Sequence, residues 1–363
     1  MKTRVLHVIG GMGRGGAPSF VINNLLRMDS SKIQFDFLVR NNNCVFTDII
    51  EKKGGRLFEV PSFPKHLISN YRETLNVFKK YGKEYDAIHV HANALYYILP
   101  LLLAKKWGIK KIILHSHNTQ SNVGIMQPLH YLNKLFVTKL ANIFLACGEE
   151  AGHWMYGNRP FEVINNAVDT QKFAYNEEAR RKIRKEFGIS DDTFVIGNVG
   201  RFEDVKNHDF LIDIFYKFHS ENPNSLLLLP GEGSLLMTMI EKVRNMGLDN
   251  CVVFPGARRD IDMIYSALDM FVMPSLFEGL PFVAIEAQCS GLKCILSTNV
   301  TNEAHLTNLC STVSLEKTVD SWTEELQTRA IEKIDRYKYS TEIRNKNYDI
   351  NYTAKRLIEI YTN

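Results

Sequence analysis

Two glutamates, Glu278 and Glu286, stand eight positions apart in a segment that is otherwise almost wholly apolar. The run 270–273 before them is predicted to be a buried strand, and 282–289 a helix with Pro281 at its first turn. Glu278 then lies in the strand-to-helix loop and Glu286 in the second helical turn. Because a carboxylate in apolar surroundings needs hydrogen-bond donors, both side chains predict a ligand rich in hydroxyls.

The start of the same helix offers a second kind of contact. The first backbone amides of a helix lack partners within it and favour anions, and here they include those of Gly279 and Leu280. Amides that hold phosphate, beside carboxylates that hold hydroxyls, suit a nucleotide sugar. The structural alternative is a first-turn glutamate matched to the helix dipole and a second glutamate that is solvated.

Two cations follow another predicted strand, at 194–199. Arg201 presents a planar fork of donors and Lys206 a point charge, which together suit a pyrophosphate whose charge grows as it departs. A solvated basic loop is the alternative interpretation of the same residues.

Four histidines close two predicted strands of the first half: His89 and His91 on one, His115 and His117 on the next. Strand alternation puts each pair on one face, at the sheet edge where ligands bind. They could hold a metal ion, but no carboxylate at comparable spacing completes a hard-metal site, so no metal is expected. The other interpretation makes them core or capping residues.

A G-x-G-x-x-G pattern follows the first predicted strand and ends at Gly16. Dinucleotide binding would require an acid that closes the second strand, and Asp36 lies inside that strand instead. The remaining interpretation is a glycine loop, with Gly15 and Gly16, whose backbone amides approach a diphosphate or an acceptor.

Short apolar strands alternate with helical stretches throughout, which is typical of parallel sheets covered by helices. Strands are predicted at 4–9, 34–39, 56–60, 87–91, 111–115, 143–147, 194–199, 226–230, 252–254, 270–273 and 293–296. The length of 363 residues fits two α/β domains, and turn-forming residues at 165–169 mark their boundary. The predicted parts are a first domain at 1–166, a second at 167–342 and a C-terminal helical piece at 343–363.

The composition excludes several classes of protein. A net charge of +4 is too small for a dedicated nucleic-acid binder. The six cysteines lack metal-ligand or disulfide spacing, and Cys147, Cys251 and Cys294 are expected to be buried free thiols. No charged-then-apolar leader opens the chain, and no apolar run approaches membrane-spanning length. A cytoplasmic location is therefore expected.

The two glutamates, in the Pro-Ser…Glu-Gly-Leu-Pro context at 274–281, resemble the EX7E motif of family-four retaining glycosyltransferases. The resemblance extends over nearly the whole chain. It implies the GT-B fold, in which two Rossmann-like domains face each other across a cleft, the first binding the acceptor and the second the nucleotide-sugar donor. The C-terminal helix of the family packs back on the first domain.

The resemblance also implies roles for single residues. His117, in Leu-His-Ser-His-Asn, matches the histidine that hydrogen-bonds the donor sugar and stabilises charge at the reacting carbon. Glu278 would hold a sugar hydroxyl and Glu286 the ribose. Arg201 and Lys206 match the residues that bind the diphosphate.

Three loops carry the rest of the resemblance. The loops at 230–233 and 254–258 look like those around the nucleobase and ribose, with Arg258 beside the base through its backbone. Gly-Gly-Ala at 15–17 resembles the family's glycine loop, although Pro18 stands where the family often carries an acid.

The expected activity is metal-independent, retaining transfer of a hexosyl group from a nucleotide diphosphate sugar, with UDP as the nucleotide, to a hydroxyl acceptor without a cofactor. No convincing carboxylate nucleophile is evident, so attack on the same face as the leaving group stays open. A non-hydrolysing sugar-nucleotide epimerase and a non-catalytic nucleotide-binding protein are the alternatives.

Segments 5–11, 32–37 and 115–118 look most like bacterial transferases of capsular or exopolysaccharide synthesis, whose acceptors are lipid-linked at the inner face of the plasma membrane. The first domain also carries basic residues among aromatic and apolar neighbours, which suit either a peripheral contact with anionic lipid or a solvated face. These residues are Lys65, His66, Arg72, Lys79, Lys80 and Lys83.

Overall fold

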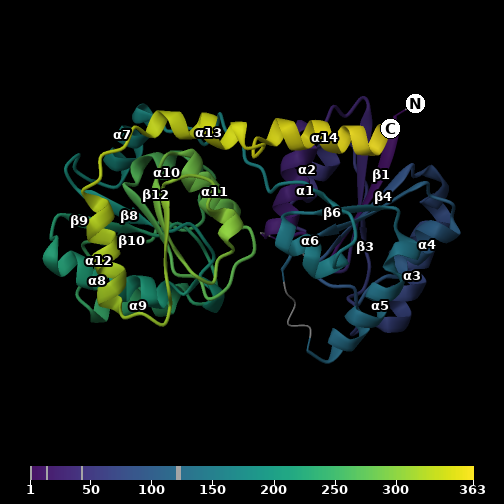
Figure 1. The fold of residues 1–363 in the computed structure, drawn as a ribbon, viewed down its shortest axis with the longest axis horizontal. Coiled ribbons are helices and arrows are strands. Elements are labelled where there is room, and N and C mark those ends of the chain that lie inside the picture. The colour runs from purple at the N-terminus through teal and green to yellow at the C-terminus, as the bar shows by residue number, and fades with distance from the viewer. Residues whose placement is uncertain (1, 14, 42–43, 120–123) are drawn as a thin grey trace. The chain divides into compact units, whose positions relative to one another are not determined.

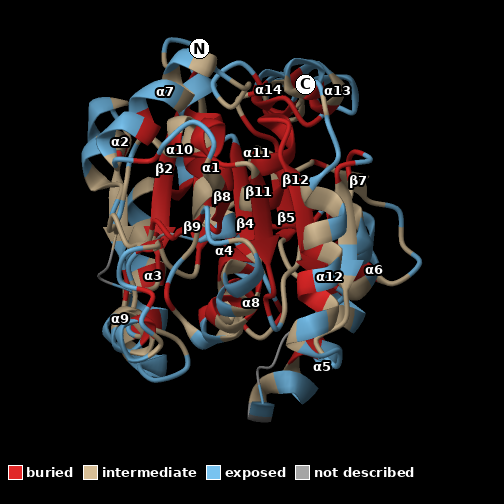
Figure 2. Ribbon diagram, turned by 90° about the vertical axis from the view of Figure 1, so that its left-hand side faces the viewer, coloured by how far each residue is buried: buried red, intermediate tan, exposed pale blue. Residues whose placement is uncertain are grey.

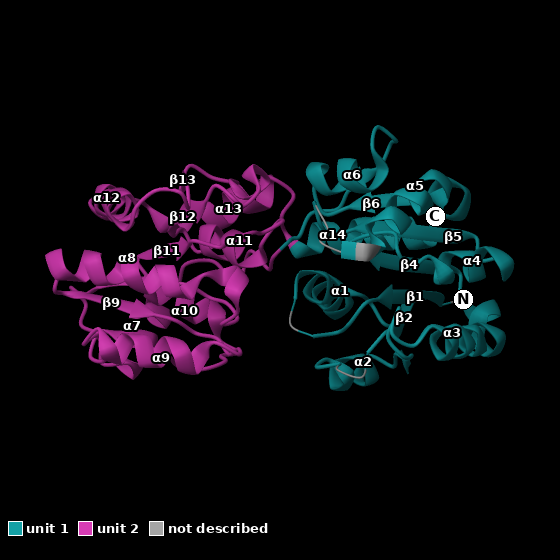
Figure 3. Cartoon of the chain, turned by 90° about the horizontal axis from the view of Figure 1, so that it is seen from below, with its two compact units in different colours: residues 1–167, 350–363 teal, residues 168–349 magenta. Residues whose placement is uncertain are grey.

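The computed structural model describes residues 2–13, 15–41, 44–119 and 124–363 (Figure 1). The chain divides into two compact units (Figure 3). Unit 1 comprises Met1–Ala167 and Ile350–Asn363, and unit 2 comprises Val168–Asp349. The division at 167 lies one residue beyond the predicted domain boundary.

Unit 1 is built on a parallel seven-stranded sheet in the order β3-β2-β1-β4-β5-β6-β7. The strands are β1 (Thr3–Ile9), β2 (Ile33–Val39), β3 (Leu57–Glu59), β4 (Ala87–Ala92), β5 (Lys111–Ser116), β6 (Ile143–Ala146) and β7 (Glu162–Val163). The helices are α1 (Gly16–Arg27), α2 (Thr47–Lys52), α3 (Leu67–Tyr81), α4 (Leu99–Lys106), α5 (Gln127–Leu140), α6 (Glu149–Tyr156) and α14 (Ile350–Thr362). The strand order reverses between β1 and β4, which is the doubly wound topology.

Unit 2 repeats this topology with six parallel strands in the order β10-β9-β8-β11-β12-β13. The strands are β8 (Phe194–Gly197), β9 (Ser225–Leu228), β10 (Val252–Val253), β11 (Met270–Met273), β12 (Lys293–Ser297) and β13 (Cys310–Val313). The helices are α7 (Glu177–Glu186), α8 (His208–Glu221), α9 (Leu236–Asn245), α10 (Ile261–Ala267), α11 (Phe282–Cys289), α12 (Val319–Ala330) and α13 (Tyr339–Asn345). The order reverses between β8 and β11.

Helices cover both faces of each sheet, so the central strands are buried on both sides and appear red in Figure 2. All four residues of β11 are buried, as are all seven of β2. This double burial is why these strands appear in the sequence as continuous apolar runs. Each of the eleven predicted strands is found, whereas the edge strands β7 and β13 were missed because they are short, only partly buried and carry polar residues.

Asp36 is the acid inside β2, and it has a structural role. Its buried carboxylate accepts hydrogen bonds from Arg4 Nε at 3.1 Å, Arg56 Nε at 2.9 Å and the Tyr85 hydroxyl at 3.0 Å. Because these donors already surround the carboxylate, Asp36 does not serve as the ribose ligand of a dinucleotide site.

A cluster of arginines fixes the end of α10 in unit 2. Arg184, buried in the core, pairs with Asp269 at 2.6 Å, and Arg180 pairs with the same carboxylate at 2.7 Å. Arg336 donates to the carbonyls of Tyr265 and Leu268, and burial lowers its pKa to about 9. These donors satisfy the last carbonyl groups of α10, which otherwise lack partners.

The C-terminal region, predicted to be a single helical piece at 343–363, is divided between the two units. Helix α13 ends in unit 2, and Asn347 then adopts a left-handed conformation with φ 65°, which asparagine tolerates better than most residues. The bridge between Val168 and Asp349 keeps residues 343–349 in unit 2. Only α14 packs on unit 1, where Thr353 donates to Asn24 of α1 at 3.3 Å.

All six cysteines lie among the described residues and are free thiols. Cys147 and Cys294 are buried as predicted. Cys251 is only partly buried, which corrects its prediction, because it precedes the short edge strand β10. No described helix combines the length and apolar character needed to cross a membrane.

Candidate active site

Glu278 lies in the loop between β11 and α11, and its carboxylate oxygen is 2.5 Å from the Lys206 ammonium nitrogen. Both side chains are mostly buried, with exposed fractions of 17% and 16%. The two residues are distant in sequence but follow the adjacent strands β11 and β8. They meet where the strand order reverses, which is the usual ligand site of a doubly wound sheet.

Backbone contacts hold this pair in place. The amide of Leu276 donates to the carbonyl of Val205 at 2.8 Å, and the Asn207 side chain donates to the carbonyl of Pro274 at 3.1 Å. Asn207 has φ 54° and ends the short turn Asp204–Lys206 that carries the ammonium group. The loops after β8 and β11 therefore form one connected platform.

Glu286 is half-buried on α11 and accepts a hydrogen bond of 3.0 Å from the hydroxyl of Tyr265. Burial raises the pKa of Glu286 to about 7, although the Tyr265 hydrogen bond and the charge of Lys172 oppose that rise. Pro281 takes the position just before the first turn of α11 and not the first turn itself.

Tyr265 is a further candidate site residue, which the sequence analysis missed. Its ring is fully buried on α10, and its hydroxyl also lies 3.2 Å from the carbonyl of Val283. In sequence it is an aromatic residue within a short helix, which is the usual signature of a core position. Only the packing of α10 against α11 reveals that its hydroxyl meets Glu286.

Arg201 is exposed in the loop after β8, close in sequence to Lys206. This loop lies against the loop after β9, since the amide of Gly200 donates to the carbonyl of Pro230 at 3.3 Å. A Cβ atom on Gly231 would approach the Gly200 oxygen to 1.9 Å, so the contact requires glycine there. The loop after β8, which is predicted to bind the diphosphate, and the loop after β9, which is predicted to lie near the nucleobase, are therefore neighbours.

Arg258 lies at the start of the segment that leads into α10. Its guanidinium pairs with Glu186 at 2.5 Å and with Asp260 at 2.7 Å, and both partners raise its pKa. Because these acids occupy the side chain, a contact with a base would come from the backbone, as the sequence analysis expected. That contact stays a prediction.

Gly15 and Gly16 lie in unit 1 at the beginning of α1. Neither has a strained conformation, and a Cβ on Gly16 would meet no atom of the described residues within 4 Å. Packing does not explain these two glycines, which leaves room for the close approach of another molecule. Arg14, within the same glycine loop, lies outside the described residues.

His117 follows β5 in unit 1, and its Nε2 lies 2.8 Å from Nδ1 of His91. Its ring stacks on His115 with centroids 4.1 Å apart, and Phe20 of α1 meets it edge-on at 5.4 Å. Burial lowers the pKa of His117 to about 3, so the imidazole is neutral at pH 7.

The four predicted histidines gather on one face of the sheet, and His7 of β1 joins them. Burial is the main cause that lowers the pKa of each of these five imidazoles. Within the described residues, two groups of three, His7 with His89 and His91 and His91 with His115 and His117, have ligand atoms within 4.8 Å of one another. Such a group could hold a metal ion, although adjacent nitrogens also stand at hydrogen-bond distance. His7 was detectable only through its matching register with His89.

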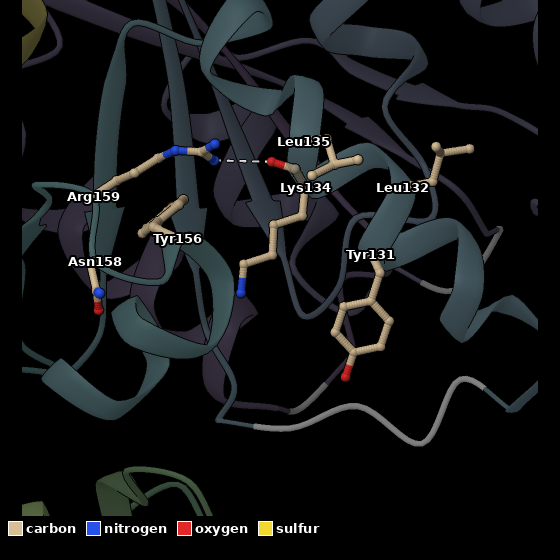
Figure 4. A pocket seen from close by; sticks show the side chains of 7 residues that line it. All are labelled: Tyr131, Leu132, Lys134, Leu135, Tyr156, Asn158 and Arg159. Atoms are coloured by element: carbon tan, nitrogen blue, oxygen red, sulfur yellow. Dashed lines mark hydrogen bonds between the residues drawn. The ribbon is translucent and has the colours of Figure 1, made fainter.

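Unit 1 also contains cavities near its helices and loops. An open cavity of about 730 Å³ lies between α5 and the end of α6, where Arg159 donates to the carbonyl of Lys134 at 3.0 Å (Figure 4). A smaller one, of about 160 Å³, borders the glycine loop and is lined in part by Gly11, Pro18, Arg40 and His91. The second cavity is the one that adjoins predicted site residues.

The chain consists of two doubly wound units. Unit 2 carries a carboxylate and a cation at its switch point, and unit 1 carries a glycine loop and a group of histidines. This combination defines the GT-B class of transferase. Crystal structures with this fold match the whole chain. HepE of Anabaena in complex with UDP has a TM-score of 0.79 at 17% identity, and the match covers 99% of each chain. WaaG, a glycosyltransferase of lipopolysaccharide biosynthesis, has a TM-score of 0.74 at 15% identity, again over 99% of each chain.

Sequence comparison gives the family. The model described as "Glycosyl transferases group 1" matches residues 179–322. EpsF of Bacillus subtilis, named as a glycosyltransferase, is 34% identical over 99% of this chain and 96% of its own length. An Escherichia coli galactosyltransferase named for UDP-Gal and a GlcNAc-diphosphoundecaprenol acceptor is 29% identical over 73% of this chain and 72% of its own. The chain belongs to the group 1, or family-four, glycosyltransferases, and the predicted family and GT-B fold are confirmed.

Proposed function

We propose that this protein transfers a hexosyl group from a UDP-sugar to a hydroxyl acceptor, with retention of configuration and without a metal ion. The observation that carries the proposal is the contact between Glu278 and Lys206 at the switch point of unit 2. Each side chain matches one half of a nucleotide sugar: the carboxylate can accept from a sugar hydroxyl, and the ammonium can bind the diphosphate.

The leaving diphosphate determines the role of the cations. Its negative charge increases as the bond to the sugar breaks, and the ammonium group of Lys206, which is already positioned before reaction, stabilises that charge together with Arg201 from the same loop. Helix α11 begins at Phe282, so its first amides would add partial positive charge at the diphosphate, and the amides of Gly279 and Leu280, which lie in the loop before the helix and not at its start, are proposed to contact the donor from that loop. A metal ion is then unnecessary for this step.

Glu286 is proposed to bind the ribose diol. With its raised pKa, the side chain is poised between its neutral and ionised forms near neutral pH. Two ribose hydroxyls would donate to the ionised carboxylate and favour that form. Tyr265 donates a hydrogen bond to this carboxylate and is therefore proposed to act as a positioning residue.

Relatives support the choice of UDP. HepE has been crystallised with UDP and with UDP-glucose, and the Escherichia coli relative is named for UDP-Gal. The donor chemistry inferred from Glu278, Glu286 and Lys206 agrees with these ligands. His117, in unit 1, is proposed to donate a hydrogen bond to the donor sugar, and the glycine loop at Gly15 and Gly16 to approach the donor or acceptor.

The proposed acceptor is a lipid-linked saccharide of bacterial polysaccharide synthesis, as the name of the Escherichia coli relative suggests. An apolar groove of about 560 Å³ in unit 1 is lined by Leu67, Ile68 and Leu102, among others. Several large apolar side chains of α3 and α5 are exposed, with Ile68 at 82% and Leu135 at 64%. With Lys65, Arg72, Lys79 and their basic neighbours, this surface suits the inner, anionic face of a plasma membrane.

The test combines binding with catalysis. Purified protein is heated with UDP-, GDP- and ADP-sugars, and a UDP-sugar is expected to raise the melting temperature most, because a ligand that binds the folded state stabilises it. Transfer to an undecaprenyl-diphosphate saccharide is then followed by chromatography. Stabilisation without transfer to any hydroxyl acceptor would indicate a binding protein, and interconversion of free UDP-sugars would indicate an epimerase.

Membrane association has its own test. Flotation with vesicles that contain anionic lipid should carry the protein upward, whereas vesicles of neutral lipid should not. The double variant Ile68→Ser and Leu135→Ser should reduce flotation, and Tyr216→Ser in unit 2, which removes another exposed large side chain, serves as the matched control. Equal flotation of all three proteins would contradict this part of the proposal.

A further inference from the structure

Three histidines on adjacent strands form a hydrogen-bonded chain that ends at His117. His117 Nε2 lies 2.8 Å from His91 Nδ1, and His91 Nε2 lies 3.0 Å from His7 Nδ1. The strands β5, β4 and β1 are neighbours in the sheet, so the chain crosses it at right angles to the strands. His91 therefore uses both of its ring nitrogens to join the other two imidazoles.

The chain has two very different ends. At His7, Nε2 is buried and has no hydrogen-bond partner among the residues that the structure describes, and the nearest described ring is that of Phe35, with centroids 4.1 Å apart. At the other end, His117 is only partly buried, and because its Nε2 faces His91, Nδ1 is the nitrogen left for a ligand.

The chemistry of imidazole restricts where the protons lie. A neutral imidazole has one N–H donor and one acceptor nitrogen, so each contact in the chain needs a donor on one side and an acceptor on the other. The protons of the three rings must then all point in the same direction along the chain. Either His117 presents an N–H at Nδ1 and His7 a lone pair at Nε2, or both ends are reversed.

The buried end favours the first arrangement. Orphaned buried N–H groups are rarer in proteins than acceptors that lack a donor. His7 Nε2 has no acceptor among the described residues and lies beside an aromatic ring, which makes a lone pair there the less costly choice. His7 then donates its Nδ1–H to Nε2 of His91, and His91 donates its Nδ1–H to Nε2 of His117.

We propose that His91, oriented by His7, is a positioning residue that holds His117 as the neutral Nδ1–H tautomer, so that His117 presents a hydrogen-bond donor to the donor sugar. The last clause rests on the proposed function, whereas the tautomer does not. Low pKa values keep all three rings neutral at pH 7, which the arrangement requires.

A second chain on the same face provides the control. His115 Nδ1 lies 3.1 Å from His89 Nε2, and His89 Nδ1 lies 2.6 Å from the Tyr361 hydroxyl of α14. His89 is on the same strand and face as His91 and is equally buried, but it makes no hydrogen bond to His117. His89→Phe is therefore matched to His91→Phe in burial and ring size.

The test is long-range ¹H–¹⁵N correlation NMR on the full chain with ¹⁵N-labelled histidine, since protonated and unprotonated ring nitrogens resonate in separate regions. Signals of His117 are assigned by their loss in His117→Gln. The expected spectrum has a protonated Nδ1 and an unprotonated Nε2. His91→Phe should move the proton toward Nε2, His91→Asn should retain the native pattern because its amide can still donate, and His89→Phe should leave the pattern unchanged.

Kinetics supply the functional half of the test. His91→Phe should lower kcat by about tenfold or more while the KM for the UDP-sugar changes by less than about twofold, and His91→Asn should recover most of the loss. A His117 protonated at Nε2 in the native protein, or a native pattern in folded His91→Phe, would overturn the proposal. So would one equivalent of tightly bound metal in the purified protein, because the histidines would then be ligands. If no donor supports transfer, the spectra still decide the tautomer.

Discussion

The ammonium group of Lys206 lies 2.5 Å from the carboxylate of Glu278. The two groups that are proposed to bind different halves of the donor thus neutralise each other, and both are largely buried. An unpaired charge in such a place would be costly, and each of the two groups supplies the partner that the other needs. Donor binding would replace one ion pair by contacts to a diphosphate and a hydroxyl.

The first prediction distinguishes the two glutamates. Glu286→Ala should weaken binding of UDP and of the UDP-sugar alike, because both contain the ribose. A hydrogen bond to a charged acceptor contributes roughly 1.5–3 kcal/mol, so the loss should be about tenfold or more. Glu278→Ala should not weaken UDP binding, since Lys206 then lacks a competing carboxylate, but it should strongly lower turnover because it removes a contact to the sugar. Calorimetric titration with UDP measures both; equal losses would contradict the proposed placement of the donor.

The second prediction concerns pH and the stability of the protein without ligand. The folded-state pKa of Glu286, about 7, lies above the ordinary value of 4.5. The folded state therefore binds this proton more tightly, so the stabilisation is complete below about pH 4.5 and is lost as pH rises toward 7. Glu286→Gln, which cannot ionise, should become more stable than the native protein by on the order of 3 kcal/mol at pH 8.

Thermal unfolding at pH 5 and pH 8 tests this effect as a difference between the two proteins. The gain for Glu286→Gln should be small at pH 5 and larger at pH 8. Glu177→Gln is a suitable control, because the pKa of that glutamate is lowered and not raised. A gain that is independent of pH would mean that the carboxyl of Glu286 is not perturbed as described.

The third prediction addresses Tyr265. Tyr265→Phe removes the hydrogen bond to Glu286, so the pKa of Glu286 should rise above about 7 and UDP should bind roughly threefold to tenfold more weakly. Tyr175→Phe also breaks a tyrosine–glutamate contact in unit 2, with Glu177, and should leave UDP affinity unchanged. UDP titrations of the two variants at pH 7 provide the comparison, and identical affinities would remove Tyr265 from the site.

The fourth prediction concerns metal ions. Because Lys206 and Arg201 are proposed to supply the positive charge that the diphosphate needs, transfer should proceed at an unchanged rate after dialysis against EDTA. Lys206→Met should instead lower kcat strongly in the presence or absence of magnesium. Activity that EDTA abolishes and manganese or magnesium restores would require a different account of the leaving group.

The sequence was sufficient for the architecture because its strands are buried on both faces and appear as uninterrupted apolar runs. It also identified Glu278, Glu286 and Lys206 as candidates, since charges in apolar segments or strand-end loops are conspicuous. It did not reveal that Lys206 and Glu278 form an ion pair, because that contact depends on the order of β8 and β11 in the sheet.

Tyr265 and His7 could not be found in the same way. An aromatic residue in a helix and a histidine within a strand are common in protein cores. A role for their polar atoms can be recognised only when the hydrogen-bond partner is known. For Tyr265 that neighbour is Glu286 on an adjacent helix, and for His7 it is His91 on an adjacent strand. The edge strands β7 and β13 were missed for a related reason. Their residues are only partly buried, so these strands do not require the continuous apolar sequence by which the central strands were predicted.

Unit 1 is discontinuous, and this has a consequence for biosynthesis. Unit 2 is formed by one uninterrupted segment, whereas unit 1 needs α14, which is translated after all of unit 2. During synthesis the face of β1 and β4 that bears the histidines therefore lacks Tyr361 and the other side chains of α14 until that helix leaves the ribosome. Unit 2 can complete its fold first, and a chain that stalls before Ile350 would expose a buried histidine face to quality control.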